Sequence, residues 1–203
     1  MLDGTARKLI DPALDRIASR MAAAGISANA VTLAGFALGI AAAGAIALGF
    51  FIPGLLLILA SRLADGLDGA VARHAGAQSD FGGYLDIVLD FAIYGAVPFG
   101  FVLADPAANA VAGAFLILTF YVNGASFLAY AIMAEKRDLK EMPRGAKSLY
   151  FTTGLAEATE TIAMFALACL MPAWFAVLAW VFGAICLYTA LSRILLAMRV
   201  LSD

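Results

Sequence analysis

The sequence has few charged residues. Only 14% of the 203 residues are Asp, Glu, Lys or Arg, against about 25% in soluble domains. Hydrophobic residues make up 64% of the chain, and the mean hydropathy is +0.93. Because a soluble domain of this size could not cover so much apolar surface, the composition excludes that class and indicates an integral membrane protein.

Cysteine and histidine are also scarce. The two cysteines, Cys169 and Cys186, lie in apolar stretches, so no disulfide framework and no cysteine metal site is expected. The single histidine, His74, has no second histidine as a partner. The N-terminus lacks the apolar segment and cleavage site of a secretory signal peptide, and we expect none. Chemistry therefore has to come from carboxylates and other polar side chains.

Long apolar runs fill most of the chain. Each is about 20 residues long, which is enough to cross the hydrocarbon core of a bilayer, and lipid forces such spans to be helical. The runs cover residues 30–50, 53–73, 81–104, 107–134, 148–171 and 173–199. We therefore predict an all-α integral membrane protein whose six transmembrane helices form a bundle over about 30–199.

Residues 1–25 differ from these runs, because basic residues alternate with Leu9, Leu14 and Ile17 at helical spacing. The pattern predicts an amphipathic helix on the membrane surface, and an ordinary soluble helix is the alternative. The whole chain, 1–203, is expected to be a single membrane domain.

The basic residues predict the orientation of the bundle. They lie in the N-terminal segment, after the second run, in the loop 135–147 and at the end of the last run, whereas the opposite turns contain none. Basic loops stay in the cytoplasm. Both termini are then cytoplasmic, and a bacterial inner membrane is the expected location.

Four aspartates interrupt the second and third runs. Asp65 and Asp68 are three residues apart, and Asp86 and Asp90 are four apart, so each pair shares one helix face. All four lie roughly 7–15 Å below the cytoplasmic end of their helices. Their burial in lipid costs on the order of 10 kcal/mol. A cage of carboxylate oxygens that binds Mg²⁺ or Mn²⁺ would offset this cost.

Simple ion pairing of the aspartates with Arg62 and Arg73 is the alternative, but it supplies two cations for four anions. Arg73 also suits bidentate recognition of a phosphate. Divalent ions and an arginine that face phosphates are typical of phosphoryl transfer.

These residues resemble the signature of the CDP-alcohol phosphatidyltransferases. The pattern reads Asp65-x2-Asp68-Gly69-x2-Ala72-Arg73-x8-Gly82-x3-Asp86-x3-Asp90. The stretch SANAVT (27–32) is similar to the family's Pro-Asn-x-x-Thr element, with Ala28 in place of the proline.

The resemblance implies a reaction and a set of roles. A CDP-lipid, usually CDP-diacylglycerol, donates its phosphatidyl group to an alcohol and releases CMP. Two divalent cations, Mg²⁺ or Mn²⁺, would be held by Asp65, Asp68, Asp86 and Asp90, with Asp90 also the general base. The CDP-lipid would contact Asn29, Thr32, Asp65, Gly69, Arg73, Ser79 and Gly82. Family members are typically homodimers, so a homodimer is expected here, and no nucleic-acid partner.

The acceptor alcohol is less well defined by the resemblance. Members of the family that use inositol phosphate have a stretch similar to GxAERxER in the fifth span. The matching stretch here reads GLAEATET (154–161), with Ala158 and Thr161 in place of the arginines. A polyol or amino alcohol is therefore the expected acceptor, and glycerol phosphate or inositol phosphate is the alternative. The expected acceptor pocket comprises Glu157, Glu160, Arg193 and Lys147.

Two other functions use aspartates inside a membrane. Intramembrane prenyltransferases pair aspartates with Mg²⁺, but they need more helices and leave the Gly-Ala-Arg elements unexplained. A cation carrier could use the carboxylates as its path, but the acids inside the apolar runs lie on the cytoplasmic half, with no matching acidic site on the far side. The enzyme is the prediction, and the carrier is the remote alternative.

Overall fold

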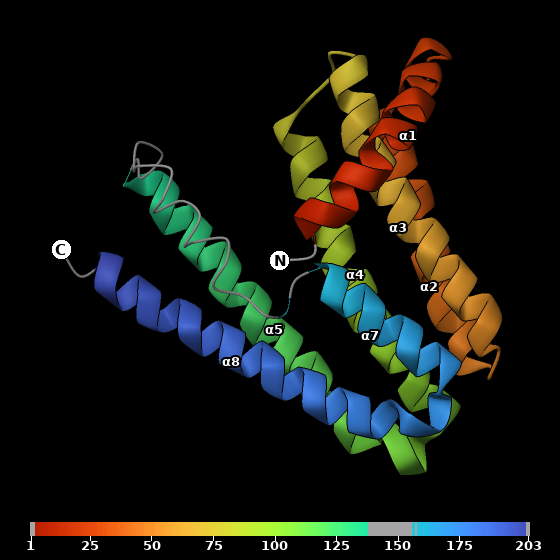
Figure 1. The fold of residues 1–203 in the computed structure, drawn as a ribbon, viewed down its shortest axis with the longest axis vertical. Helices are drawn as coiled ribbons and strands as arrows, with labels where there is room; N and C mark the ends of the chain where they lie inside the picture. Colours follow the sequence, from red (N-terminus) through yellow and green to blue (C-terminus); the bar gives the residue numbers. More distant parts are fainter. Residues whose placement is uncertain (1–2, 138–155, 157, 202–203) are drawn as a thin grey trace.

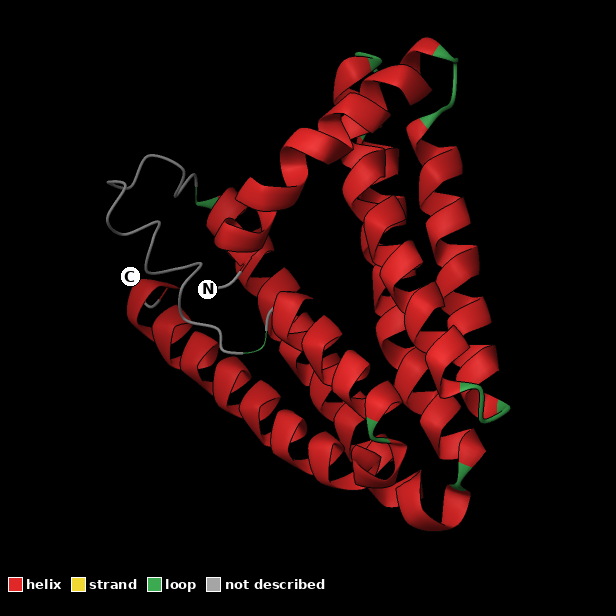
Figure 2. Cartoon of the chain, turned by 45° about the vertical axis from the view of Figure 1, so that its right-hand side comes forward, coloured by secondary structure: helices red, strands yellow, loops and turns green. Residues whose placement is uncertain are grey.

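The computed structural model describes residues 3–137, 156 and 158–201 of the chain (Figure 1). Its elements are α1 (Asp3–Ala23), α2 (Ala28–Ala47), α3 (Phe51–His74), α4 (Asp80–Ala104), α5 (Pro106–Lys136), α7 (Ala158–Leu170), the 3₁₀ turn η2 (Pro172–Trp174) and α8 (Phe175–Leu201). Helices and short loops account for the whole of this part, which contains no strand (Figure 2). The predicted all-α class is confirmed.

Four helical segments are long and apolar enough to cross a membrane, and this indicates a multi-pass membrane protein. They are Ala28–Ala47, Asp80–Ala104, Pro106–Lys136 and Pro172–Leu201. Helix α3 coincides with the predicted span 53–73 but is too polar to be among them. The predicted span 148–171 lies partly outside the described residues, and α7 covers 13 of its residues, Ala158–Leu170. The count of six spans stays a prediction.

Local sequence explains where the helices that carry the site begin. Ser27 and Ser79 precede α2 and α4, and their side chains accept hydrogen bonds from the backbone N–H groups of Ala30 and Gly82. Such caps satisfy donors that the first turn of a helix leaves unpaired. Between α2 and α3, Gly49 has φ of +82°, a conformation that only glycine adopts readily. These caps and the turn set where the helices begin and end, and α2 packs against both α3 and α4.

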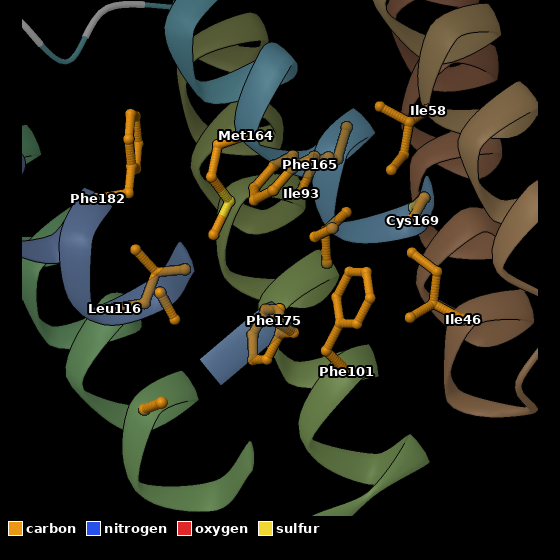
Figure 3. Close-up of a cluster of buried hydrophobic side chains, with 14 of the residues drawn as sticks. Ile46, Ile58, Ile93, Phe101, Leu116, Met164, Phe165, Cys169, Phe175 and Phe182 are labelled. Atoms are coloured by element: carbon orange, nitrogen blue, oxygen red, sulfur yellow. The ribbon is translucent and has the colours of Figure 1, made fainter. Parts of the chain in front are cut away.

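The apolar core lies where α3 begins and α4 ends. Phe101 stacks on Phe51 and on Phe175, with ring centroids 5.8 Å and 4.4 Å apart. Ile46 and Cys169 belong to the same buried cluster (Figure 3). Helices α5 and α8 pack against each other and diverge from α3 toward their far ends (Figure 1). The core therefore fixes one end of the bundle, whereas the aspartates lie toward the other ends of α3 and α4.

Helix α1 packs against α3 (Figure 1). Ala18 is fully buried in a small apolar cluster with Val31 and Val71. Nε2 of His74 lies 2.8 Å from Oδ1 of Asp15 and ties the end of α3 to α1. The structure therefore places a helix at the N-terminus, whereas its amphipathic character and its location on the membrane surface stay predictions.

Helices α2 and α4 approach each other closely at Gly100. A Cβ atom added to Gly100 would lie 2.6 Å from the backbone oxygen of Ala43, whereas one added to Gly95 would meet nothing within 4 Å. Gly100→Ala is therefore expected to lower the stability by about 1–3 kcal/mol. Gly95→Ala, in the same helix, should be neutral or stabilising by up to about 1 kcal/mol. Thermal unfolding in detergent measures both, and equal midpoints for the two variants would contradict the close packing.

Candidate active site

Three of the four aspartates come together between α3 and α4. One carboxylate oxygen each from Asp65, Asp86 and Asp90 lie within 4.8 Å of one another, and all three residues are partly buried. An Mg²⁺-sized ion holds its oxygen ligands at about 2.1 Å, so small side-chain rotations would let the three share one ion. The donor set therefore fits a hard divalent cation, as the sequence predicted.

A small cavity lies beside these carboxylates, between α2, α3 and α4. Its volume is about 10 Å³, which is the space that a single water molecule needs. Phe36 and Leu89 line it together with all four aspartates and Thr32. The cavity has room for an ion but not for a nucleotide.

Asp68 lines the same cavity but lies outside the three-residue cluster. Thr32 Oγ1 donates a hydrogen bond of 2.6 Å to Asp68 Oδ2. The backbone N–H of Gly69 donates to Asp68 Oδ1 at 2.5 Å. Asp68 is only 7% exposed, and both of its oxygens are fixed. Thr32, the threonine of the SANAVT stretch, therefore orients one aspartate of the signature.

Arg62 lies in the site, but the sequence did not reveal its role. In the sequence it is, together with Arg73, only a possible ion-pair partner of the aspartates in place of a metal. Its Nη1 atom lies 2.7 Å from Asp90 Oδ1 and 3.7 Å from Asp65 Oδ2. The ion-pair alternative is thus partly correct, because Arg62 contacts two of the carboxylates. Arg73 is exposed, and its guanidinium lies over Gly69, with Nη1 3.5 Å from the position of an added Cβ.

The remaining residues expected to bind the CDP-lipid lie at the same ends of α2 and α4. A Cβ added to Gly82 would be 3.2 Å from Ser79 Oγ and 3.3 Å from Asn29 Oδ1. Asn29 and Ser79 are thus neighbours, and Gly82 leaves open the space between them and α4. Together with Thr32 and Arg73 they border the aspartates on one end of the bundle.

The expected acceptor pocket is only partly visible. Lys147 and Glu157 lie outside the described residues, and Glu160 is partly buried in the first turn of α7. Arg193 of α8 donates from Nη1 to the backbone oxygen of Asn123 at 3.0 Å and to Ser126 Oγ at 2.7 Å. These contacts tie α8 to α5. They do not bring Arg193 to the aspartates.

Comparison with known proteins identifies the family. Residues 25–192 match the CDP-alcohol phosphatidyltransferase family over most of the chain. The chain belongs to this family. The predicted resemblance is confirmed, and the protein is a membrane-embedded transferase of phospholipid synthesis.

Among curated relatives, the inner membrane protein YnjF of Escherichia coli is 46% identical over 194 residues, which are 96% of this chain and 94% of YnjF. The archaetidylinositol phosphate synthase of Methanothermobacter thermautotrophicus is 44% identical over 84 residues, which are 41% of this chain and 40% of that enzyme. Its counterpart in Pyrococcus horikoshii is 33% identical over 97 residues, 48% of this chain and 52% of the relative.

A solved structure shares the fold. The phosphatidylinositol phosphate synthase of Mycobacterium tuberculosis with CDP-DAG bound superposes with a TM-score of 0.68 at 20% identity, covering 89% of this chain and 91% of that one. The same enzyme in complex with manganese and citrate gives a TM-score of 0.64 at 19% identity, with coverages of 89% and 87%. At this identity the likeness concerns the architecture.

Proposed function

We propose that this protein transfers the phosphatidyl group of CDP-diacylglycerol to the hydroxyl of a small polar alcohol and releases CMP. The observation that carries the proposal is the cluster of Asp65, Asp86 and Asp90, placed by α3 and α4 within the family signature. The remote alternative, a cation carrier, leaves the nucleotide-binding part of that signature without a use.

The donor set supports two divalent cations, Mg²⁺ or Mn²⁺, held by Asp65, Asp68, Asp86 and Asp90. When bound, such ions would neutralise the negative charge of the pyrophosphate and of the leaving CMP. The anchored carboxylate of Asp68 would present its remaining lone pairs to one side of the site.

In this scheme Asp90 is the general base. It would take the proton of the acceptor hydroxyl while the hydroxyl oxygen forms a bond to the lipid-side phosphorus and the bond from that phosphorus to CMP breaks. We assign the proton to Oδ2 of Asp90, because Arg62 contacts Oδ1. We assign the CDP-lipid to the residues around Asn29, Thr32, Gly69, Arg73, Ser79 and Gly82, as the sequence predicted.

For the acceptor we propose a non-phosphorylated polyol or amino alcohol, with Glu160 and Glu157 as contacts. Two observations support this choice: Ala158 and Thr161 stand where arginines are expected for inositol phosphate, and Nη1 of Arg193 is used within the α5–α8 contact. A phosphorylated acceptor is the second candidate, because two archaeal relatives are archaetidylinositol phosphate synthases.

We further propose that the site faces the cytoplasm, with both termini on that side, and that the chain forms a homodimer. The concentration of lysine and arginine in the N-terminal segment, the loop 135–147 and the last turn supports the orientation. The dimer is supported by the resemblance to the family alone.

The test is CMP release from CDP-diacylglycerol by the purified protein with Mn²⁺ or Mg²⁺ and a panel of alcohols. The panel pairs each free alcohol with its phosphate: inositol, glycerol and an amino alcohol against their phosphorylated forms. We expect release with one non-phosphorylated alcohol, and little without an alcohol. Release only with inositol phosphate or glycerol phosphate would replace the proposed acceptor with the second candidate. Divalent-ion flux in liposomes with no CMP release would favour the carrier and contradict the enzyme.

A further inference from the structure

Arg62 is a buried cation in direct contact with the aspartate cluster. It lies three residues before Asp65 on the same face of α3, and its side chain is only 10% exposed. A buried cation is costly unless it is paired. Its partners here are Asp90 at 2.7 Å and Asp65 at 3.7 Å, one on the neighbouring helix and one on its own. Arg62 is no part of the family signature between Asp65 and Asp90.

Arg62 is itself fixed by its surroundings. Its Nη2 atom donates to Ser61 Oγ at 3.3 Å. On another side, the ring of Tyr94 lies 5.7 Å from the guanidinium carbon, a cation–π contact. Tyr94 in turn packs on Phe120 and Phe165, with ring centroids 6.3 Å and 6.5 Å apart. The guanidinium is therefore held between the aspartates and an aromatic cluster.

We propose that Arg62 is a positioning residue that holds the carboxylate of Asp90 in the orientation needed for proton abstraction. The proposal rests on the proposed function, in which Asp90 is the base. Two of the aspartates have anchors of different kinds: Thr32 and Gly69 N–H fix Asp68, and Arg62 fixes Oδ1 of Asp90. With Oδ1 fixed, rotation of the carboxylate is restricted and Oδ2 keeps one direction.

The charge of Arg62 has a second consequence that a purely structural role lacks. The positive charge of the Arg62 guanidinium repels any divalent cation that binds to the aspartate cluster. Removal of this charge should therefore tighten divalent-ion binding while it slows the reaction. Loss of folding would instead lower both the reaction rate and the affinity for divalent ions. The direction of the change in ion affinity therefore distinguishes a positioning role from structural damage.

The test compares Arg62→Met, which keeps a flexible unbranched stem but removes the guanidinium and its charge, with Arg62→Lys, both in the whole chain in detergent. We expect Arg62→Met to lower kcat for CMP release by about 10- to 100-fold. KM for the CDP-lipid should stay within about twofold, because Arg62 is not among the residues to which we assign the CDP-lipid. Mn²⁺ binding, followed by electron paramagnetic resonance, should tighten on the order of tenfold. Arg62→Lys should restore part of kcat and return Mn²⁺ affinity toward the wild-type value.

Arg137→Met is the matched control, because Arg137 donates to the backbone oxygens of Val200 and Leu201, at the end of α8. It should change neither kcat nor Mn²⁺ affinity. The role of Arg62 is overturned if wild-type protein releases CMP and Arg62→Met keeps its kcat, or if kcat, Mn²⁺ affinity and melting temperature fall together. Absence of CMP release from the wild type in every condition would instead overturn the proposed function and the assignment of Asp90 with it.

Discussion

Asp90→Asn is expected to lower kcat for CMP release by about 10²- to 10⁴-fold, the usual contribution of a general base. The side chains have nearly the same shape, and the amide oxygen can still accept the hydrogen bond that Arg62 donates to Asp90 Oδ1 at 2.7 Å. An amide cannot take the acceptor's proton at neutral pH. The variant should therefore fold and bind the CDP-lipid while turnover is nearly lost.

Asp80→Asn provides the matched control for this variant. Asp80 lies in the first turn of the same helix, is exposed and is no part of the aspartate cluster. The same chemical change there should leave CMP release close to the wild-type rate. A rate for Asp90→Asn within a few-fold of wild type would show that another group accepts the proton.

Removal of divalent metal should abolish the activity, and Asp86→Asn should prevent its full recovery. Asp86 contributes one of the three oxygens that lie within 4.8 Å of one another. Mutation of a residue that only hydrogen-bonds to a metal ligand weakens metal binding by about 10- to 100-fold. Loss of a ligand itself should therefore lower the Mn²⁺ affinity at least as much. Chelation followed by Mn²⁺ titration measures the effect, both as recovered CMP release and as bound Mn²⁺.

Asp80→Asn again serves as the control, because it removes a carboxylate from α4 outside the cluster. It should recover activity at the same Mn²⁺ concentration as the wild type. Undiminished release by chelated wild-type protein would rule out the metal role, and equal Mn²⁺ affinity in Asp86→Asn and wild type would place the ion elsewhere.

Spacing predicted the aspartate cluster because both aspartate pairs lie on single helix faces. Asp65 and Asp86 belong to consecutive helices joined by the short loop between His74 and Asp80, so the two faces could meet only between α3 and α4. The apolar runs predicted most helices to within a few residues, since in lipid long apolar segments have no alternative to helix. Fold class and the core of the site were therefore readable from the sequence.

The side-chain partners could not be predicted in the same way. The hydrogen bond between Thr32 and Asp68 joins residues 36 positions apart, and it depends on how α2 and α3 are rotated toward each other. From the sequence Arg62 is one of two possible counter-charges, and its contacts with Asp90 and with the ring of Tyr94 become visible only in the folded structure. Arg193 contacts Asn123 because α5 and α8 pack together, a pairing that no motif encodes.

Helix α3 has a further consequence for how the chain enters a membrane. Arg62, Asp65 and Asp68 fall near one another in this helix, and translocon insertion scales assign each such residue about 2.5–3.5 kcal/mol when it lies at a helix centre. On its own, α3 would therefore partition poorly into lipid. Its extensive contact with α2, and the ion pair from Arg62 to Asp90 of α4, indicate that α2, α3 and α4 insert as one cooperative unit. The charge of the site then makes membrane insertion of α3 depend on two neighbours, the apolar α2 and α4, which itself carries Asp86 and Asp90.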